Sequence, residues 1–328
     1  MAGNYLVTGA AGFIGSNVVA QLLAAGHQVT GIDNINDAYD TRLKRWRLDL
    51  LSVDPRFQFH EADIVSTPQL ELIFAESKPF DAVINLAARA GVRPSVENPW
   101  IYFQANTDGT LNLLDLCRRN NVPKFVLSST SSLYGGHNTI PFSEDADTNR
   151  PLSPYAASKK GAEAISYTYH HLHNLDITVL RYFTVYGPCG RPDMSIFRFV
   201  RKIAEGEPII VFGDGTQQRD FTYVEDIARG TIAALQPVGY EAINLGGDQP
   251  IVLNDIIARI SRLVDREAKI IHKPAHPADV PATWASIEKA KRLLGWGPKI
   301  DIDEGLRRCV EWYRANRELA CSVSLGDG

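Results

Sequence analysis

Short apolar runs alternate with longer amphipathic stretches along the first 180 residues of the chain. The apolar runs predict strands, and the stretches with apolar residues at helical spacing predict helices. Strand–helix alternation with connections this long requires parallel pairing and right-handed crossovers. The pattern therefore predicts an α/β fold with a doubly wound parallel sheet, whose ligands lie at the carboxyl ends of the strands. The predicted strands are 4–8, 28–32, 57–61, 82–86, 124–128 and 177–181, and the predicted helices are 13–25, 67–77, 107–121 and 154–173.

The alternation ends near residue 182, where proline and glycine become frequent, as at 187–188, 213–215 and 295–298. Such breaks predict a smaller, less regular lobe. We expect residues 1–182 to form a nucleotide-binding domain and 183–320 to form mainly the second lobe, with parts of about 220–250 returning to the first domain. Asp301, three residues before Glu304, predicts the start of a last helix. Residues from Ser322 on, within an expected tail at 321–328, are predicted to fray.

Composition narrows the class of protein. The 328 residues are 45% hydrophobic and 22% charged, as in soluble globular proteins, so disordered and fibrous folds are excluded. The 34 basic and 38 acidic residues leave a net charge of −4, and no basic stretch predicts nucleic-acid binding. No apolar run is long enough for a membrane span, and no signal peptide is visible. The four scattered cysteines predict neither a disulfide framework nor a metal site, so we expect a cytoplasmic protein.

Three glycines, Gly9, Gly12 and Gly15, lie between the first predicted strand and the first predicted helix. Small residues there let backbone N–H groups approach a diphosphate at the positive end of a helix. Asp33 follows Gly15 by 18 residues at the end of the second strand, where a carboxylate binds the adenosine ribose. Its charge repels a 2′-phosphate, which favours NAD over NADP. Asp63, placed at the end of the third strand, is expected within reach of the adenine.

Tyr155 and Lys159 lie four residues apart on a predicted helix and therefore share one face. A free phenol titrates near about 10, and a neighbouring ammonium stabilises the phenolate and lowers that value. A tyrosine and a lysine that merely share a surface would show the same spacing. The hydroxyl-rich segment 128–134, at the end of the fifth strand, favours a catalytic interpretation because its side chains converge on the same place.

With these motifs the chain resembles the extended short-chain dehydrogenase/reductases, and within them the nucleotide-sugar 4-epimerases. The resemblance covers residues from about 3 to 317. It implies a Rossmann-like doubly wound parallel sheet that binds NAD, with a smaller, irregular α/β lobe for a UDP-sugar. Besides the glycine motif and the Tyr155–Lys159 pair, the matching segments are 85–88, 181–188, 212–215, 219–224 and 279–284.

The resemblance also assigns roles to residues. Tyr155 is the base at the sugar O4, Lys159 holds the nicotinamide ribose and tunes Tyr155, and Thr130 is the hydroxyl partner of O4, with Ser132 beside it. The remaining residues that it implies for NAD are Gly9, Gly12, Phe13, Ile14, Gly15, Asp33, Asn34, Asp63, Ile64, Leu86, Ala87, Ala88, Ser128, Tyr182 and Phe183.

For the substrate, Arg219 matches an arginine that binds the UDP diphosphate, a role that a guanidinium suits. Phe212 matches an aromatic wall beside the uracil, and Thr184 matches a position that faces the sugar. A solvated surface arginine and a core phenylalanine are the structural alternatives. The other residues that we expect at the substrate are Arg89, Ser129, Thr130, Ser132, Arg191 and Asp279.

Three reactions share this scaffold, and all begin by oxidising C4 of the sugar. The dehydratase branch carries two acids where this chain has Ser131 and Ser132, and the decarboxylase branch keeps a glutamate at the position of Ser132. Serine cannot do that acid–base work near neutral pH. The sequence therefore favours 4-epimerisation, in which NAD is regenerated. A net NAD-dependent nucleotide-sugar oxidoreductase, or a regulatory NAD-binding protein without catalysis, is the alternative from another class.

The loop 190–194 is similar to the loop of UDP-glucuronate 4-epimerases, in which the arginine faces the C5 carboxylate. Arg191 would then bind the acid, although Cys189 departs from the tryptophan usual beside it. UDP-glucuronate to UDP-galacturonate is the implied reaction, and UDP-glucose or UDP-N-acetylglucosamine is the alternative substrate. A loop arginine paired with Asp193 is the structural alternative. Relatives form homodimers through helices that match 107–121 and 154–173, so we expect a homodimer.

Overall fold

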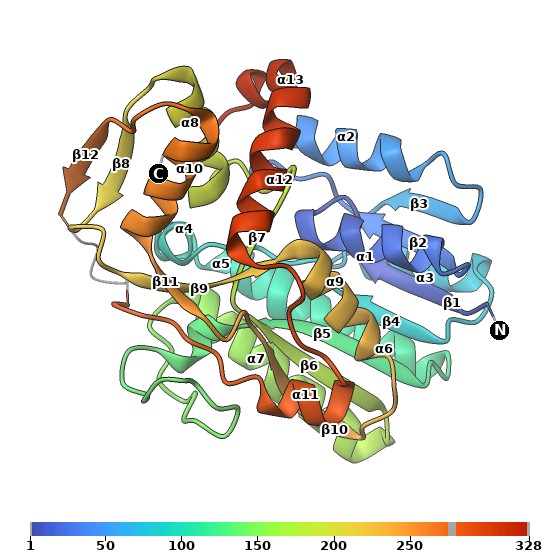
Figure 1. Ribbon diagram of the computed structural model, residues 1–328. Coiled ribbons are helices and arrows are strands. Elements are labelled where there is room, and N and C mark those ends of the chain that lie inside the picture. Colours follow the sequence, from blue (N-terminus) through green and yellow to red (C-terminus); the bar gives the residue numbers. More distant parts are fainter. Residues whose placement is uncertain (1, 275–279, 327–328) are drawn as a thin grey trace.

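The computed structural model describes residues 2–274 and 280–326. Within these residues the main sheet has seven strands, all paired in parallel, in the order β10-β6-β5-β4-β1-β2-β3 (Figure 1). The predicted doubly wound α/β fold is confirmed. The strand order reverses between β1 and β4, which is where such sheets bind ligands. The strands are β1 (Asn4–Thr8), β2 (Gln28–Asp33), β3 (Phe57–Glu61), β4 (Ala82–Asn85), β5 (Lys124–Thr130), β6 (Asp176–Tyr182) and β10 (Tyr240–Leu245).

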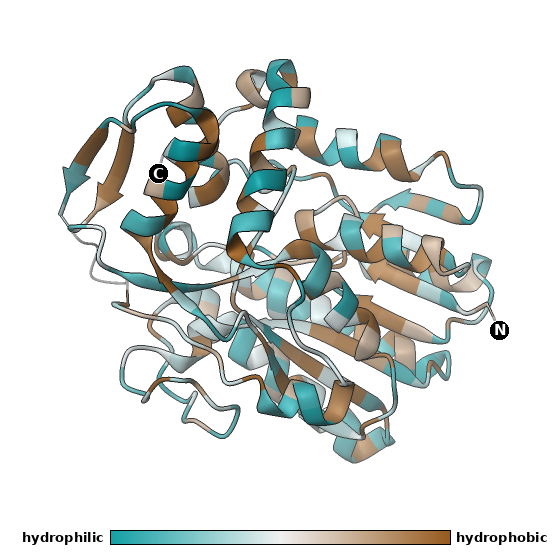
Figure 2. Ribbon diagram, in the orientation of Figure 1, coloured by the Kyte–Doolittle hydropathy of each residue, from teal (hydrophilic) through white to brown (hydrophobic). Residues whose placement is uncertain are grey.

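Helices cover both faces of this sheet, which explains why its central strands β4 and β5 are buried along their whole length. One face packs against α1 (Phe13–Ala24), α9 (Val224–Ala233) and α11 (Glu288–Leu294) in a single core cluster. The other face packs against α3 (Thr67–Glu76), α6 (Gly109–Arg119) and α7 (Pro154–His173). In Figure 2 brown, apolar segments dominate the central strands between these layers, whereas the edge strand β3 also carries teal, hydrophilic segments. The two faces alternate along each strand, as with Leu6 and Val7 on β1.

The second lobe has its own core, in which α8, α10 and α12 pack against two small sheets. Its longest helix, α12, begins after Asp301, whose carboxylate accepts a hydrogen bond from the Glu304 N–H (2.8 Å), as predicted. The lobe's elements are β7 (Thr184–Tyr186), α8 (Ser195–Glu205), β8 (Ile209–Phe212), β9 (Gln218–Tyr223), β11 (Pro250–Val252), α10 (Leu253–Val264), β12 (Ile270–Lys273), α12 (Ile302–Ala315) and α13 (Arg317–Ser322).

Some local expectations were wrong. Helix α2 (Thr41–Leu51) was not predicted, since Lys44 and Arg47 interrupt its apolar pattern yet point inward. The helix expected to start at residue 107 is preceded by α4 (Val92–Glu97), α5 (Trp100–Phe103) and a π-helical turn, η1 (Gln104–Asp108).

Two further expectations about chain ends need correction. The third strand stops at Glu61, so Asp63 lies two residues beyond it. The expectation of a frayed end is wrong for Val323, which is buried against Leu43 of α2. Apolar contact with α2 holds this part of the C-terminal segment. In the described ranges, no helix is both long and apolar enough to cross a membrane.

Candidate active site

A cavity of about 640 Å³ opens at the carboxyl ends of the central strands. It brings together residues that directly follow β1 and β4, residues of β2, β5 and the start of α7, and the segment at the end of β6, as expected for a sheet of this topology. Every residue that the sequence analysis associated with NAD, and most of those associated with substrate, line this one cavity. They are Gly9, Gly12, Phe13, Ile14, Gly15, Asp33, Asn34, Asp63, Ile64, Leu86, Ala87, Ala88, Arg89, Ser128, Ser129, Thr130, Ser132, Tyr155, Lys159, Tyr182, Phe183, Thr184 and Arg191.

The turn between β1 and α1 is shaped for a diphosphate. Gly9 has φ +68°, and a Cβ there would lie 2.8 Å from the Ala87 nitrogen. A Cβ on Gly15 would clash with the Gly9 carbonyl, so the strand and the helix can approach this closely only with glycine. Gly12 is the N-cap of α1, so no side chain accepts a hydrogen bond from the N–H groups at the start of this helix. The first turn of α1, which lies within the described residues, also contains no acidic residue. Its N–H groups and its positive dipole end are therefore available to an anion.

Acidic and amide groups surround the adjoining part of the cavity. The Asp33 carboxylate at the end of β2 is buried and accepts a hydrogen bond from the Ile35 N–H (2.9 Å). Lys44 Nζ lies 3.5 Å from Asp33 Oδ1, and burial lowers the pKa of this lysine. Asn34 Nδ2 donates to Asp63 Oδ2 (2.7 Å). The Asp33 carboxylate and the glycine turn together fit a dinucleotide, the carboxylate at a ribose and the turn at the diphosphate. Lys44 was missed because α2 was not predicted.

Tyr155 and Lys159 lie on the first two turns of α7, which Ser153 and Pro154 start. The Ser153 hydroxyl accepts the Ala156 N–H (3.2 Å), and proline suits the first helical position. Lys159 Nζ donates to the Ser128 carbonyl (2.8 Å) at the end of β5, which anchors the ammonium under the cavity.

The hydroxyls at the end of β5 meet Tyr155 as the sequence predicted. The Tyr155 hydroxyl is hydrogen-bonded to Thr130, and Thr130 Oγ1 donates to Ser132 Oγ (3.1 Å). Thr130 also caps the 3₁₀ turn η2 (Ser131–Tyr134) by accepting the Ser132 N–H (3.1 Å). A phenol and a hydroxyl therefore face one point of the cavity, beside a buried ammonium.

The charges around this pair act in opposite directions. Burial raises the pKa of Tyr155, while the Thr130 hydrogen bond and the Arg191 charge oppose that rise. Burial lowers the pKa of Lys159 to about 7, and the Glu163 carboxylate partly offsets it. The cavity thus holds an ammonium that can lose its charge near neutral pH, next to a phenol that is stabilised in its neutral form.

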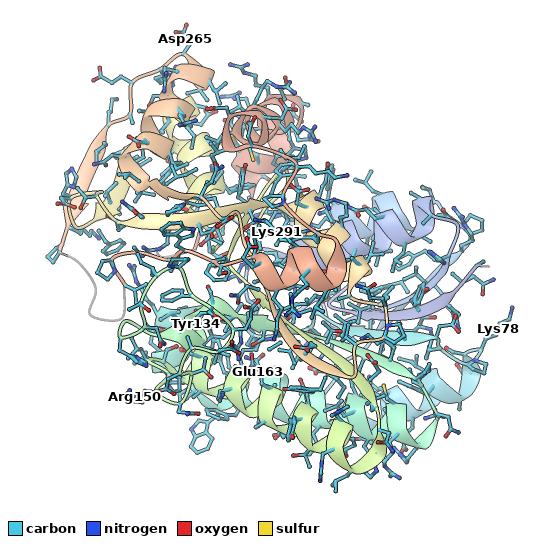
Figure 3. All side chains as sticks on the ribbon, turned by 60° about the horizontal axis from the view of Figure 1, so that its bottom comes forward. Lys78, Tyr134, Arg150, Glu163, Asp265 and Lys291 are labelled. Atoms are coloured by element: carbon cyan, nitrogen blue, oxygen red, sulfur yellow. The ribbon has the colours of Figure 1, made fainter. Side chains whose placement is uncertain are left out.

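Glu163, one turn beyond Lys159, is a group that the sequence analysis missed. Its carboxylate accepts the Ser129 hydroxyl (2.6 Å) and two guanidinium N–H groups of Arg181 (3.0 and 2.9 Å). Arg181 also donates to the Tyr134 hydroxyl (3.0 Å); Figure 3 labels Tyr134 and Glu163. The ion pair is buried and joins α7 to β6, and the Ser129 hydrogen bond holds the end of β5 against α7. No local spacing signals it, since Glu163 and Arg181 lie on different elements.

Arg191 lines the cavity and forms the pair with Asp193 that the sequence left open. Its Nε donates to Asp193 Oδ1 (3.1 Å) and its Nη2 to Asp193 Oδ2 (2.6 Å). This pair uses one edge of the guanidinium. Nη2 also donates to the Ala90 carbonyl at 3.5 Å. In the described part of the chain, Nη1 donates no hydrogen bond to the protein, so its N–H groups can still bind an oxyanion.

Two expected substrate residues lie outside this cavity. Phe212 is outside the cavity lining, and its ring centre is 4.0 Å from the Arg93 guanidinium. Arg219 is also outside the lining, and its Nη1 donates to the Gln218 carbonyl (2.8 Å). Asp279 is outside the described residues.

Several lining residues were not anticipated. Tyr39 and Lys44 belong to the region of the unpredicted helix α2, and Gln104 belongs to the π-helical turn, so neither group had a signal that pointed to the cavity. Among residues 2–274 and 280–326, no group of histidine, cysteine, aspartate and glutamate could hold a metal ion. The other unanticipated lining residues with polar side chains are Asn36, Ser131 and Asp193.

The site places a phenol one helical turn from a lysine and beside a turn that fits a diphosphate. Such a pair can transfer a proton to and from a substrate hydroxyl next to a bound dinucleotide. Fold and site therefore define the class as the extended short-chain dehydrogenase/reductases. Within that class, the model of the NAD dependent epimerase/dehydratase family matches residues 5–246. The chain belongs to this family, and NAD is its cofactor.

Individual relatives are similar over almost the whole chain. UDP-glucuronate 4-epimerase of Thermodesulfobacterium geofontis is 58% identical over 324 residues, which cover 98% of this chain and 100% of that protein. The crystal structure of UDP-glucuronic acid 4-epimerase from Bacillus cereus, in complex with UDP-glucuronic acid and NAD, is 37% identical with a TM-score of 0.89. That match covers 95% of this chain and 99% of the other. UDP-glucose 4-epimerase from Thermotoga maritima, with UDP-glucose, is 32% identical with a TM-score of 0.88, over 96% and 99%.

Proposed function

We propose that the protein is an NAD-dependent UDP-sugar 4-epimerase that interconverts UDP-glucuronate and UDP-galacturonate. The observation that carries the proposal is Arg191, which lines the same cavity as Tyr155 and Thr130 and influences Tyr155 electrostatically. A guanidinium beside the reacting hydroxyl suits a sugar that carries a carboxylate. The similarity to UDP-glucuronate 4-epimerases supports this substrate.

Tyr155, Thr130 and Lys159 would carry the proton transfer. Tyr155 takes the proton from the sugar O4, and Thr130 donates a hydrogen bond to the same oxygen. Lys159 stabilises the phenolate by its charge and holds the cofactor ribose. NAD, when bound, supplies the acceptor and later the donor of the hydride at C4. The 4-keto sugar rotates in the cavity and presents its other face, and Tyr155 then returns the proton to O4 of the epimer.

The hydroxyls of Ser131 and Ser132 support epimerisation over elimination. Loss of water from the keto sugar needs acid–base groups at these positions, and neither serine supplies one near neutral pH. In the site proposed here, elimination is therefore disfavoured, and the keto sugar is reduced again on either face.

Arg191 has a second task in this scheme. A 4-keto uronic acid is a β-keto acid, which loses CO₂ when its carboxylate aligns with the carbonyl group. A guanidinium that holds the carboxylate by two hydrogen bonds prevents that alignment, and a hydrogen bond to a charged group contributes roughly 1.5–3 kcal/mol.

We assign residues 1–182, with α9 and β10, to NAD, and most of residues 183–320 to the UDP-sugar. Arg219 and Phe212, which lie outside the cavity lining, stay proposed contacts of the diphosphate and the uracil on the family resemblance alone. A cytoplasmic location agrees with four unpaired cysteines. A homodimer through α6 and α7 is supported by the exposed apolar side chains of this region, which are Trp100, Phe103, Leu111, Tyr167 and Leu172.

The activity is tested by incubating the protein with UDP-glucuronate and separating the products. We expect UDP-galacturonate to accumulate to equilibrium while absorbance in the NADH band stays flat. Tyr155→Phe, which removes the hydroxyl and little else, should lower kcat by orders of magnitude while NAD still binds. Steady formation of free NADH would identify a net oxidoreductase instead.

Substrate choice is tested with Arg191→Ala. Because it removes the partner of the carboxylate, kcat/KM for UDP-glucuronate should fall by roughly ten- to a hundred-fold. Calorimetry on the NAD-loaded protein gives the dissociation constants of both sugars. The affinity for UDP-glucuronate should also fall, whereas the affinity for UDP-glucose, which has no carboxylate, should change much less. Equal losses on both sugars would show that Arg191 only supports its loop.

A further inference from the structure

Arg47 is a buried arginine on α2 that no sequence motif singled out. Its Nη1 donates to the Ala11 carbonyl (3.1 Å) and to the Tyr39 hydroxyl (2.9 Å). Its Nη2 donates to the Cys189 carbonyl (2.6 Å) and, at longer range, to the Gly190 carbonyl (3.4 Å). One side chain therefore joins three separate segments of the chain.

The two loops that Arg47 joins have different tasks. Ala11 lies between Gly9 and Gly12, in the turn that fits the diphosphate of the dinucleotide. Cys189 and Gly190 directly precede Arg191, the proposed partner of the substrate carboxylate. The guanidinium is thus a rigid link between the cofactor turn and the acid-binding loop, because its N–H groups lie in one plane in a fixed fork.

The acid-binding loop needs such a support. Cys189 has φ +51°, a left-handed conformation that is unfavourable for a residue with a side chain. Its thiol side packs on Leu43 of α2 and on Val323, and its carbonyl is held by Arg47. Helix α2 and Val323, which follows α13, the helix drawn beside α2 in Figure 1, therefore hold the loop in a conformation that it would not adopt alone.

The charge of Arg47 also links this residue to cofactor binding. Among the described residues, its hydrogen-bond partners are carbonyls and a phenol, and it forms no ion pair with a carboxylate. A buried charge without a counter-ion is costly. The dianionic diphosphate that the neighbouring turn is shaped to bind supplies negative charge on this side of the molecule. Tyr39 continues the link, since its ring centre is 5.7 Å from Arg47 and also 5.7 Å from Arg191.

We infer that Arg47 is a positioning residue that couples cofactor binding to recognition of the substrate's acid group. It holds the diphosphate turn through Ala11 and the Arg191 loop through Cys189 and Gly190. The inference rests on the proposed function for the role of Arg191, but the contacts of Arg47 with both loops do not depend on it.

The test uses Arg47→Met, which keeps an unbranched apolar chain and removes the fork and the charge. Arg45→Met, an exposed site on the same helix, is the matched control. On the NAD-loaded protein, we expect Arg47→Met to reduce the preference for UDP-glucuronate over UDP-glucose, measured as a ratio of dissociation constants, by roughly tenfold. The NAD dissociation constant of the stripped protein should also rise by roughly tenfold. Arg45→Met should change neither.

A double-mutant cycle separates positioning from general destabilisation. If Arg47 acts on the acid through Arg191, adding Arg47→Met to Arg191→Ala should leave the sugar preference unchanged, while NAD binding should still weaken. Arg47→Lys, which keeps the charge but not the fork, allows the same comparisons if the methionine variant does not fold.

Three outcomes would overturn the inference. These are equal losses for both sugars on Arg47→Met, an undiminished effect in the Arg191→Ala background, and unchanged NAD affinity. If Arg191→Ala itself does not discriminate between the sugars, the assignment of the acid fails, and the coupling fails with it. If only the Arg47 variants fail to behave as stated, the assignment of Arg191 stands.

Discussion

At the scale of single residues, the site depends on groups whose charge is controlled by burial. Lys159 is buried with one carbonyl and one hydroxyl as its hydrogen-bond partners, and its pKa is lowered to about 7. Tyr155 is shifted the other way, so that neither group carries its charge easily in the absence of ligands. Catalytic groups are commonly held in such perturbed states, ready for a bound ligand to change them.

The lysine makes stability depend on pH. Its folded pKa of about 7 lies below the ordinary value of 10.5, so the unfolded chain binds its proton more tightly. Unfolding then takes up a proton between these values, and the free energy of unfolding contributed by this group rises with pH across that window, by at most about 1.4 kcal/mol per pH unit. Lys159→Met should remove this rise in urea unfolding of the cofactor-free protein. Lys160→Met, which leaves Lys159 in place, should keep it; parallel profiles for wild type and Lys159→Met would contradict the assignment.

Asp33 should determine the choice between the two nicotinamide dinucleotides. Asp33→Ala removes the carboxylate that is proposed to bind the ribose and to repel a 2′-phosphate. Lys44 Nζ, which lies 3.5 Å from Asp33 Oδ1 in the wild type, can then attract that phosphate. We expect NAD to bind more weakly, and the ratio of NADP to NAD dissociation constants to fall at least roughly tenfold. Titrations with both cofactors measure it, with Asp49→Ala on the exposed side of α2 as the control. An unchanged ratio would refute the role at the ribose.

At the scale of elements, α7 carries the proposed proton-transfer pair, and its start is well defined. Ser153 caps it, Pro154 begins it, and Tyr155 follows directly, so the cap also positions the phenol that is proposed as the base. The helix ends at His173, and the left-handed conformation of Asn174 terminates it. The predicted bounds 154–173 were confirmed.

Loss of the cap should reduce stability in a predictable way. Ser153→Ala removes the acceptor of the Ala156 N–H and should lower the free energy of unfolding by about 1 kcal/mol. Thr168→Ala, an exposed position inside the same helix, should cost less because alanine favours the helix. Chemical denaturation of both variants checks this. A smaller loss for Ser153→Ala than for Thr168→Ala would mean that the cap contributes little.

At the scale of the whole molecule, the polar cavity contrasts with an apolar surface on α5, α6 and α7. The cavity takes up the polar residues at the strand ends, while α5, α6 and α7 keep large apolar side chains in contact with solvent, among them Trp100, Leu111 and Leu172. Exposed apolar groups collected on neighbouring helices are typical of an association surface. This agrees with the proposed homodimer.

The dimer is open to a direct test. We expect light scattering coupled to size exclusion to show twice the chain mass for the wild type. Leu111→Glu places a charge on α6 within the proposed interface and should shift the mass toward the monomer by destabilising contacts between copies. Leu50→Glu, at an exposed leucine of α2, should leave the mass unchanged. Dissociation by both substitutions, or by neither, would argue against this interface.

The sequence by itself determined what depends on short spacing. Local patterns encode the succession of strands and helices along the chain, the glycine turn at Gly9–Gly15, the position of Asp33 at the end of a strand, and the Tyr155–Lys159 pair. For such features, the geometry of one strand, turn or helix decides which side chains are neighbours. Only the tertiary structure decided the Glu163–Arg181 pair, the Lys44–Asp33 contact and the links from Arg47 to Ala11 and Cys189. These contacts join residues far apart in the chain, and their polar members look like surface residues until packing buries them. Burial against distant segments, which no local pattern records, is the physical reason for the difference.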